Sequence, residues 1–158
     1  MIKLIRLDYR LLHGQVCFTW VQHVSANRVI IVDDASATDD LKKAALKLAK
    51  PQGVRLNVFT IAATLKKMPK ILELDENIIM IFGNTSALAQ FCEAYPKVAQ
   101  RVKVNYGATA NKAGAKQVDD SVFLNAAEQE DTRRILAQGV EIFSQQTPSM
   151  PKKAIASM

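Results

Sequence analysis

Residues 2–24 read IKLIRLDYRLLHGQVCFTWVQHV, and this stretch sets the class of the fold. The run IKLIRL at 2–7, rich in isoleucine and leucine, predicts a strand. After a polar turn, apolar residues recur at the spacing of one helix face: Val16, Cys17, Trp20, Val21 and Val24. The stretch is therefore a strand followed by a helix that packs on a sheet.

The same strand and helix unit recurs along the chain. Apolar runs at 28–34, 53–60 and 77–83 are followed by amphipathic runs, which predict helices over 38–50, 61–68 and 85–95. Two of the strands are continuously apolar, as parallel strands buried on both faces are. We therefore predict the α/β class, a three-layer α/β/α sandwich with a mostly parallel sheet of about six strands.

The last third of the chain is expected to hold a fifth strand, a loop, a helix and a final strand. VKVN at 102–105 predicts the fifth strand, and the Gly- and Ala-rich YGATANKAGAK at 106–116 predicts the loop. Asn125 is expected to cap a helix that Gly139 ends. The direction of the final strand, VEIFSQ at 140–145, stays open.

Length and composition point to one domain with an aliphatic core. The chain has 158 residues, 49% of them hydrophobic and only 6% aromatic. We predict a single domain over 1–148 and a frayed C-terminal tail over 149–158. The net charge of +6 would attract phosphates or acidic proteins. No basic run with interleaved aromatics is present, which argues against nucleic acid as a partner.

The two cysteines and the first ten residues bear on location. Cys17 and Cys92 lack the paired spacing of zinc, haem or redox motifs and lie in apolar patterns, as buried thiols in a reducing cytoplasm do. Charged residues interrupt the N-terminus, and no apolar stretch approaches the ~20 residues that cross a bilayer. We expect a cytoplasmic protein.

Charged groups gather in the loop between the first strand and the first helix. Loops at the carboxyl ends of parallel strands form ligand crevices, and a helix that starts at Gly14 directs free amides toward an anion. Arg6 and Arg10 supply planar donors for phosphate oxygens, while Asp8 would hold an arginine and limit the positive charge. Both arginines favour an uncharged imidazole at His13, which could attack a phosphoryl group. No metal or cofactor is required.

Other interpretations of this loop stay open on the residues alone. His13 could cap a turn while the arginines form surface pairs with Asp8. The loop could also hold a phosphate-bearing metabolite without a covalent step, as in a regulatory binding module. A hydrolase that uses His13 and Asp8 is a further alternative, although an acyl-transfer version lacks a Ser or Cys nucleophile in a strained turn.

The motif RLDYRLLHGQV at 6–16, with Trp20 downstream, resembles the opening signature of the IIB components of the mannose-, fructose- and sorbose-type sugar phosphotransferase system. In that family the pattern Arg-x-Asp-x-Arg-x-x-His-Gly-Gln surrounds the phosphorylated histidine. The stretch RVIIVDDASATDDLKKAALKLAKPQGVRLNVFT at 28–60 is similar to the family's second and third strands with their helix. LAQGVEIFSQQTP at 136–148 resembles its closing helix and strand.

The resemblance implies a phosphotransferase in which His13 takes phosphate on Nδ1 from a IIA phosphohistidine. The phosphate then passes to a sugar held by membrane-bound IIC and IID partners, which would tie the chain to the inner face of the membrane. Arg6 and Arg10 would stabilise the transferring group, and Asp8 and Gln15 would shape the binding loop. The sugar, the oligomeric state (a homo-oligomer included) and whether IIA is a separate chain stay open.

The sequence departs from the family pattern at three places. Tyr9 stands where an acid is frequent, residues 83–86 replace a basic residue followed by Thr-Pro, and residues 105–108 keep an Asn-Val-Gly pattern only in part. These departures leave sugar specificity and the rim of the site open. Tyr106 lies in the predicted flexible loop, and we expect it to contact an incoming partner.

Several further polar residues have structural and functional interpretations. Asp33 and Asp34 could hold Mg²⁺ with Asp39 or Asp40, but the favoured interpretation makes Thr38 a helix cap with Asp39 and Asp40 in the first turn.

Asn84 and Thr85 are expected to cap a helix and to lie at the rim of the site. His23 is expected at the solvated end of the first helix, and Trp20 in the core.

Overall fold

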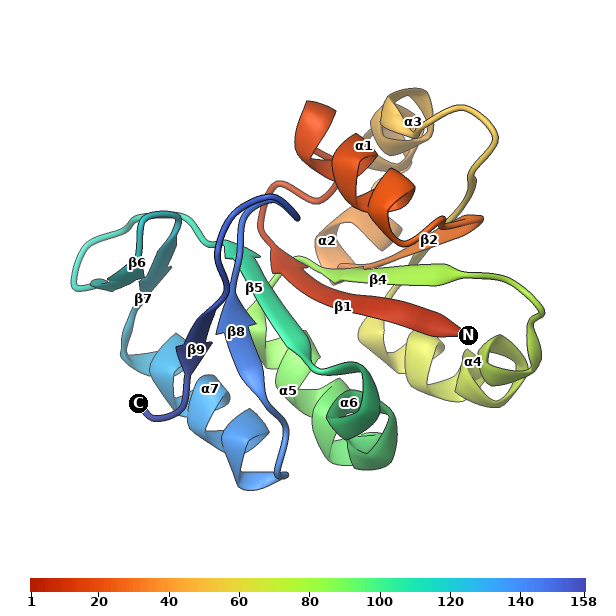
Figure 1. The fold of residues 1–158 in the computed structure, drawn as a ribbon. Coiled ribbons are helices and arrows are strands. Elements are labelled where there is room, and N and C mark those ends of the chain that lie inside the picture. The colour runs from red at the N-terminus through yellow and green to blue at the C-terminus, as the bar shows by residue number, and fades with distance from the viewer.

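The computed structural model describes residues 1–158 and has a seven-stranded sheet at its centre (Figure 1). In spatial order the strands are β3 (Arg55–Phe59), β2 (Arg28–Val32), β4 (Ile78–Phe82), β1 (Ile2–Asp8), β5 (Val104–Ala108), β8 (Ile142–Ser144) and β9 (Lys153–Ile155). All neighbours run parallel except β8 and β9. The predicted α/β class with a mostly parallel sheet is confirmed, with seven strands rather than six.

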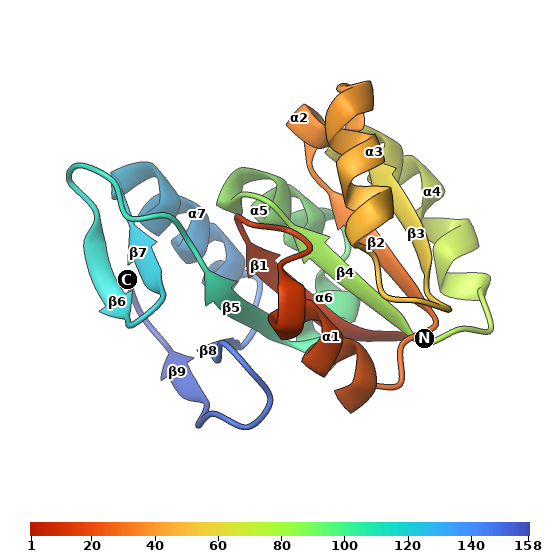
Figure 2. The same cartoon turned by 90° about the horizontal axis from the view of Figure 1, so that it is seen from above.

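Helices cover both faces of the sheet and give three layers (Figures 1 and 2). One face carries α1 (Gly14–His23) and α3 (Asp40–Ala49), which follows the short α2 (Asp34–Ala37). The other face carries α4 (Ile61–Glu73), α5 (Thr85–Ala94), α6 (Pro96–Val102) and α7 (Ala126–Ala137). No helix lies over β5, β8 and β9 on the α1 side. None of the helices combines the length and the apolar character needed to span a bilayer.

Burial explains why the apolar runs form these strands. All five residues of β4 are buried, as are four of the five in β2. Because successive side chains of a strand point to opposite faces, β4 places Ile79 in the cluster under α1 and α3, and Met80 in the larger cluster under α4 to α7. Burial on both faces requires apolar side chains at every position.

The strand order positions the loop after β1. The neighbours β1 and β4 are followed by α1 and α5, which lie on opposite faces of the sheet. Where the helices that follow two neighbouring strands lie on opposite faces, a crevice opens at the carboxyl ends of those strands. The loop from Tyr9 to His13 lies at this crevice (Figure 2).

The C-terminal segment differs from the prediction. Residues 149–158 were expected to be a frayed tail, which is wrong for residues 153–155, because these form β9 on the edge of β8. The register places Ile155 beside Ile142, and Ile155 is buried. The sequence does not predict this strand, because a proline and two lysines precede its single large apolar residue, Ile155. VEIFSQ itself forms β8, which runs parallel to β5, so the reversed strand is β9.

The region after the fifth strand also differs. The strand predicted at 102–105 runs instead from Val104 to Ala108, so the start of the predicted loop is buried strand. A hairpin of β6 (Lys116–Asp119) and β7 (Val122–Leu124) follows, which sequence analysis missed. It docks on the end of β5, where the Ser121 hydroxyl donates to the Gly107 carbonyl at 2.7 Å.

Candidate functional site

His13 lies at the start of α1 with its side chain exposed to solvent. Its backbone is extended (φ −121°, ψ 94°), its side chain caps no amide, and its carbonyl accepts from Val16 N at 3.2 Å. The amides of Gly14 and Gln15 have no acceptor in the protein, as the first amides of a helix commonly do not. An accessible imidazole and two free donors therefore face the same solvent at the positive end of a helix.

Two residues of this loop have backbone conformations in the left-handed region. Leu11 has a φ of 62°, which is uncommon for a residue with a side chain, and Gly14 has a φ of 45°. The Leu11 amide donates to the Asp8 carbonyl at 3.0 Å and closes the turn. Gly14 allows the chain to enter the helix in the left-handed region, which a side chain would disfavour. Backbone strain of this kind clusters at functional sites.

Asp8 connects both arginines and is itself buried, with 1% of its side chain exposed. Its Oδ1 accepts from the Arg10 amide at 3.0 Å and from Arg10 Nε at 3.1 Å. Its Oδ2 accepts from Arg6 Nη2 and Arg10 Nη2, each at 3.1 Å. The predicted role of Asp8 in holding an arginine is therefore seen in the geometry, while its burial leaves no face for direct contact with a substrate.

Arg6 is buried beneath the loop, with 2% of its surface exposed. Its Nη1 donates to Asn105 Oδ1 at 2.5 Å and to the Gln145 carbonyl at 3.1 Å. Gly107 makes room for it, because a Cβ at that position would overlap the guanidinium. Burial lowers the pKa of Arg6 from its ordinary value, although the neighbouring carboxylate of Asp8 opposes that effect. Arg6 thus lies behind Asp8 and not on the open surface that the sequence suggested.

Arg10 is the arginine that reaches solvent. A fifth of its side chain is exposed, and its hydrogen bond with Asp8 raises the pKa of the guanidinium. Nε and Nη2 are both bonded to Asp8, so the edge that carries Nη1 points away from the carboxylate. The structure therefore offers one fixed cationic edge near the start of α1, together with the free amides.

Trp20 and Cys17 are buried residues of α1 that lie beneath the loop. Trp20 is buried, as predicted, and its Nε1 donates to the Gln146 carbonyl at 3.0 Å. The Arg6 guanidinium lies 5.5 Å from the Trp20 ring centre, a distance at which a cation is attracted to the ring face. Burial raises the pKa of Cys17 to about 11, so this thiol is unsuited to act as a nucleophile at neutral pH.

The loop after β4 is a neighbour of the loop after β1. A Cβ at Gly83 would come within 3.2 Å of the Leu11 side chain, so the two loops pack closely. Asn84 Oδ1 accepts from the Ala87 amide at 2.9 Å, which confirms the predicted cap of α5. The placement of residues 83–86 at the edge of the crevice fits the expected rim.

The acidic residues after β2 act as helix caps. Asp33 accepts from the amide of Ser36 at the start of α2, and Asp34 accepts from the Ile61 amide at the start of α4. Asp39 caps α3, so the prediction that Thr38 caps this helix is wrong. Thr38 instead ends α2, because two short helices replace the single helix expected from the sequence. No cluster of three potential ligands is present that could hold a metal ion.

The prediction that Tyr106 contacts a partner is wrong. Tyr106 is fully buried, and its hydroxyl lies 2.8 Å from Thr132 Oγ1. Because Thr132 Oγ1 donates to the Glu128 carbonyl, the Tyr106 hydroxyl is the donor to Thr132. The apolar surroundings raise the pKa of Tyr106. Its neighbours Asn105 and Gly107 face the other side of β5 and hold Arg6.

Sequence reasoning did not assign Asn105, Gly107 and Gln145 to the site. The only signal was the partial Asn-x-Gly pattern at 105–107, since the pairing of β5 with β1 places Asn105 beside Arg6. Gln145 contributes through its backbone carbonyl, so its side chain carries no signal.

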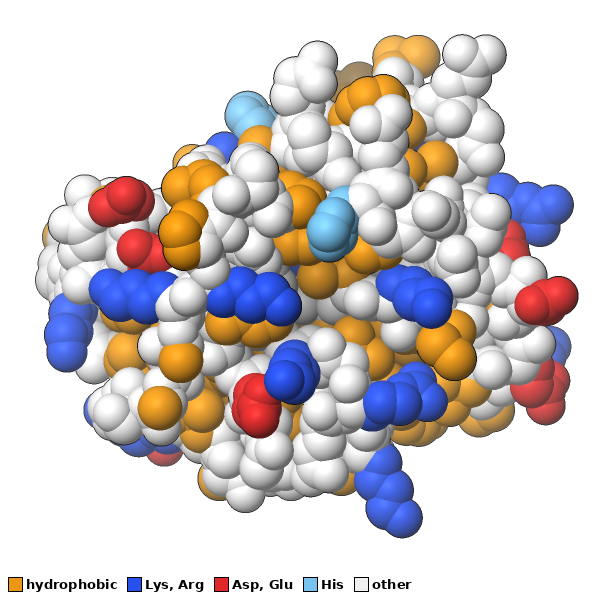
Figure 3. All heavy atoms as spheres, viewed as in Figure 1, with side chains coloured by type: hydrophobic (Ala, Val, Ile, Leu, Met, Phe, Trp, Pro, Cys, Tyr) orange, Lys and Arg blue, Asp and Glu red, His pale blue; other side chains and the backbone are white.

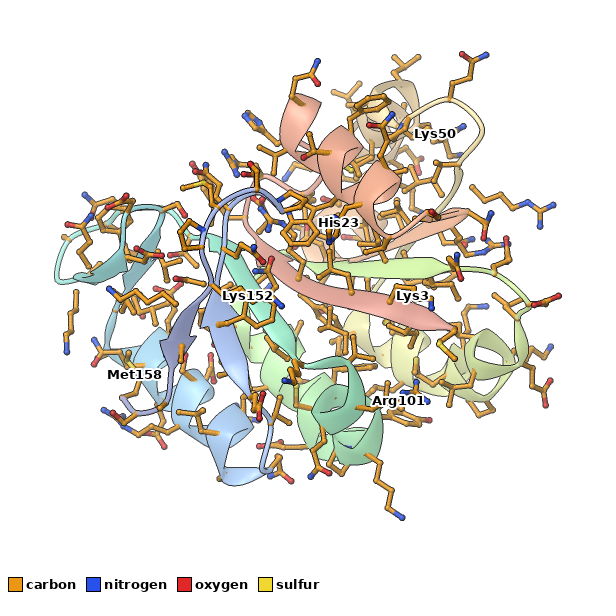
Figure 4. The ribbon with its side chains drawn as sticks, in the orientation of Figure 1. Lys3, His23, Lys50, Arg101, Lys152 and Met158 are labelled. Carbon is orange, nitrogen blue, oxygen red and sulfur yellow. The ribbon has the colours of Figure 1, made fainter.

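His23 behaves as predicted and lies at the last turn of α1 (Figure 4). It lies ten positions after His13, a distance of roughly 15 Å along the axis. Its ring packs edge-on against Trp20, with centroids 5.7 Å apart. It belongs to a different part of the surface from the candidate site.

Comparison with known proteins places this geometry in a family context. The sequence profile described as PTS system sorbose subfamily IIB component matches residues 2–158. The chain is 30% identical over 155 residues to the N-acetylgalactosamine-specific phosphotransferase enzyme IIB component 1 of Escherichia coli K12, covering 98% of this chain and 96% of that protein.

It is 28% identical over 152 residues to the PTS system mannose-specific EIIAB component of the same strain, covering 96% of this chain and 46% of that protein. The chain thus spans about half the length of that relative.

A solved structure has the same fold. The crystal structure of the IIBSor domain of the sorbose permease from Klebsiella pneumoniae superposes with a TM-score of 0.89 at 27% identity, covering 99% of this chain and 94% of that domain.

Proposed function

Because the chain belongs to the sorbose subfamily of phosphotransferase system IIB components, we propose that it is a phosphoryl carrier in sugar uptake and that His13 holds the phosphoryl group. One observation carries the proposal. An exposed imidazole stands at the positive end of a helix whose first two amides are unbonded, three residues after Arg10, which holds Asp8 and keeps a fifth of its side chain exposed.

Two displacements at phosphorus make up the proposed reaction. A ring nitrogen of His13, Nδ1 on the family pattern, forms a bond to phosphorus as the bond to the histidine of a IIA donor breaks. A sugar hydroxyl then attacks the same phosphorus, the bond to His13 breaks, and the hydroxyl proton leaves to solvent. The protein returns to its starting state, and no metal or cofactor takes part.

The surrounding groups divide the work of stabilising the transferring group. The Nη1 edge of Arg10 and the amides of Gly14 and Gln15 can donate to phosphoryl oxygens, whose charge is spread over three positions in the transition state. The Gln15 side chain, exposed in the first turn, lies at the rim. Asp8 and Arg6 act as positioning residues, because they are buried and hold Arg10 in place.

We place the protein at the inner face of the membrane, between a IIA donor and a IIC/IID permease that holds the sugar. The mannose-specific relative is an EIIAB component, in which A and B components are joined, and this supports a IIA partner. The face of the molecule seen in Figure 3 displays many basic and few acidic side chains, among them Lys3 on β1, Arg101 on α6 and Lys152 beside β9 (Figure 4). Such a surface favours acidic partners and makes association slower at high salt.

The decisive experiment is incubation of the protein with a phosphorylated IIA donor, followed by intact mass measurement before and after mild acid treatment. We expect one phosphoryl adduct that acid removes, since phosphorus–nitrogen bonds to imidazole are acid-labile. The chain contains only two histidines, so His13→Ala tests the assignment and His23→Ala is its matched control. The first variant should form no adduct, and the second should form it at the wild-type rate.

Two outcomes would contradict the proposal. An adduct that persists in His13→Ala would move the phosphoryl group to another residue. A wild-type protein that binds phosphate-bearing metabolites but takes up no phosphoryl group would instead be a regulatory binding module.

A further inference from the structure

The helix α3 presents its apolar face to solvent, the reverse of what an amphipathic helix on a sheet usually does. Leu41 is 82% exposed and Leu48 is 89% exposed. Ala44, Ala45 and Ala49 are exposed as well. At 100° per residue these five side chains occupy an arc of about 140° on one side of the helix. We call them the α3 stripe.

The inner side of α3 explains how the helix stays on the sheet. Leu46 is the one buried residue of the helix and joins the cluster under α1 and α3. Lys43 and Lys50 flank it and are half-buried. Core packing therefore uses a single leucine, and it does not account for the two leucines on the opposite side. No other element lies over that side of α3 (Figures 1 and 2).

We propose that the α3 stripe is a contact between two copies of this chain, related by a two-fold axis that sets the two α3 helices antiparallel. This inference goes beyond the phosphoryl-carrier function and does not depend on it. In a two-fold contact the same patch must complement itself, so its two ends must match each other. The stripe meets this condition in shape and in charge.

Four of the five residues of the stripe are arranged symmetrically about its middle. Ala44 and Ala45 lie at the centre, and small side chains there allow two helix axes to approach closely. Leu41 and Leu48 lie one turn from the centre on either side. In an antiparallel pair, Leu41 of one copy therefore lies against Leu48 of the other, at both ends of the contact.

The flanking charges match in the same arrangement. Asp40 and Lys47 lie on the same flank of the stripe, about 20° apart around the helix at 100° per residue. When Ala44 and Ala45 of the two copies face each other, Asp40 of one copy lies within roughly 3 Å along the axis of Lys47 of the second copy. Two such ion pairs form in each dimer. In a parallel pair this flank of one copy would lie against the opposite flank of the other, so Asp40 of one copy and Lys47 of the second copy would not meet.

The stripe is small compared with stable interfaces, which bury about 800 Å² on each partner. A ten-residue helix offers only part of that area, so the dimer should be weak and visible at high protein concentration.

The experiment is sedimentation equilibrium of the full chain from about 10 μM to 1 mM at low salt, a range that covers weak complexes. We expect the mean mass to rise toward that of a dimer. Leu48→Glu should raise the dissociation constant at least about tenfold, because it removes two buried leucines from each dimer. Leu72→Glu is the matched control, since Leu72 is a 43% exposed leucine on α4, across the sheet. Thermal melts verify that each variant is folded.

Charge exchange tests the antiparallel geometry. Asp40→Lys and Lys47→Glu should each weaken self-association, because each sets like charges opposite one another. An equimolar mixture of these two variants should associate again, since every contact in the mixed dimer then joins opposite charges. The double variant should recover likewise.

A wild-type protein that is monomeric at 1 mM would overturn the proposal, as would a dimer that Leu48→Glu leaves unchanged. A mixture that stays monomeric would overturn the antiparallel pairing. Vesicles containing phosphatidylserine that bind a strictly monomeric protein through Leu48 would overturn the proposal in favour of a lipid surface.

Discussion

Gly107→Ala should destabilise the protein at the candidate site, because it adds a methyl group in the space that the Arg6 guanidinium fills. The added Cβ would overlap Arg6 Cζ and both terminal nitrogens. These atoms cannot move without loss, since they are bonded to Asn105, to the Gln145 carbonyl and to Asp8. Gly107 does not have a positive φ, so the expected effect comes from the overlap and not from backbone strain.

The size of the effect follows from the burial of the Arg6–Asp8 pair. Removing one partner of a buried ion pair costs about 3–5 kcal/mol, because the remaining charge is left without compensation. Displacing Arg6 has a similar consequence for Asp8, which keeps only Arg10. We expect Gly107→Ala to lower the free energy of unfolding by about this amount, and the midpoint temperature by roughly 6–20 °C for a domain of this size.

The assay is urea unfolding of a double-mutant cycle with Arg6→Ala. Arg6→Ala alone should also be strongly destabilising, because it leaves Asp8 and Asn105 without their donor. In that background Gly107→Ala should cost less than about 1 kcal/mol, since the methyl group enters space that the guanidinium has left. Gly53→Ala is a control for backbone strain alone, because Gly53 has a φ of 80° and nothing within 4 Å of an added Cβ.

The reasoning is refuted if the two substitutions are additive. Additivity would mean that Gly107 acts through something other than the space that Arg6 fills. A loss of less than about 1 kcal/mol in Gly107→Ala would refute it equally, because a tolerant site cannot be holding a buried ion pair in a fixed position.

Three further outcomes follow from the geometry. Arg10→Lys should slow phosphoryl uptake from a IIA donor about tenfold or more with little loss of stability, because an ammonium group cannot keep two bonds to a carboxylate and still present a fixed edge; rapid-quench kinetics and urea unfolding measure the two effects. Tyr106→Phe should cost about 0.5–1.5 kcal/mol in urea unfolding, because Thr132 loses its donor, and should leave uptake unchanged. Asp119→Asn should make the free energy of unfolding depend less on pH in the acid range. The hydrogen bond from Ser144 lowers the pKa of Asp119 below its ordinary value. Its contribution to stability is therefore complete above the unfolded pKa and is lost as pH falls through the lower folded pKa, which unfolding at acid pH would reveal.

The sequence was sufficient to predict the parts of the fold that burial dictates. Strands such as Arg28–Val32 and Ile78–Phe82 are apolar at nearly every position, and only a sheet covered on both faces uses such runs. The caps at Asn84 and Asn125 were predictable for a local reason, since each bonds an amide three residues ahead. Neither prediction needed knowledge of distant contacts.

The errors arose where distant contacts decide the structure. Lys153–Ile155 becomes a strand only because β8 offers a free edge. The glycine and alanine that follow Tyr106 predict a loop, yet the glycine is there to admit Arg6 within a buried strand. In both cases the local composition suggested a flexible segment, and a partner far away in the chain supplied the order.

The same distinction separates the two arginines of the motif. From spacing alone, Arg6 and Arg10 are equivalent neighbours of His13, but their burial assigns them different tasks. A guanidinium with three protein acceptors and almost no exposed surface cannot also bind an arriving phosphoryl group, so in the proposed transfer Arg6 would act only through Asp8. Asp8 offsets the charge of one arginine, which leaves about one net positive charge at the surface. The proposed carrier must release phosphate as readily as it accepts it, and a single fixed cation with two amides suits that requirement better than two exposed arginines would.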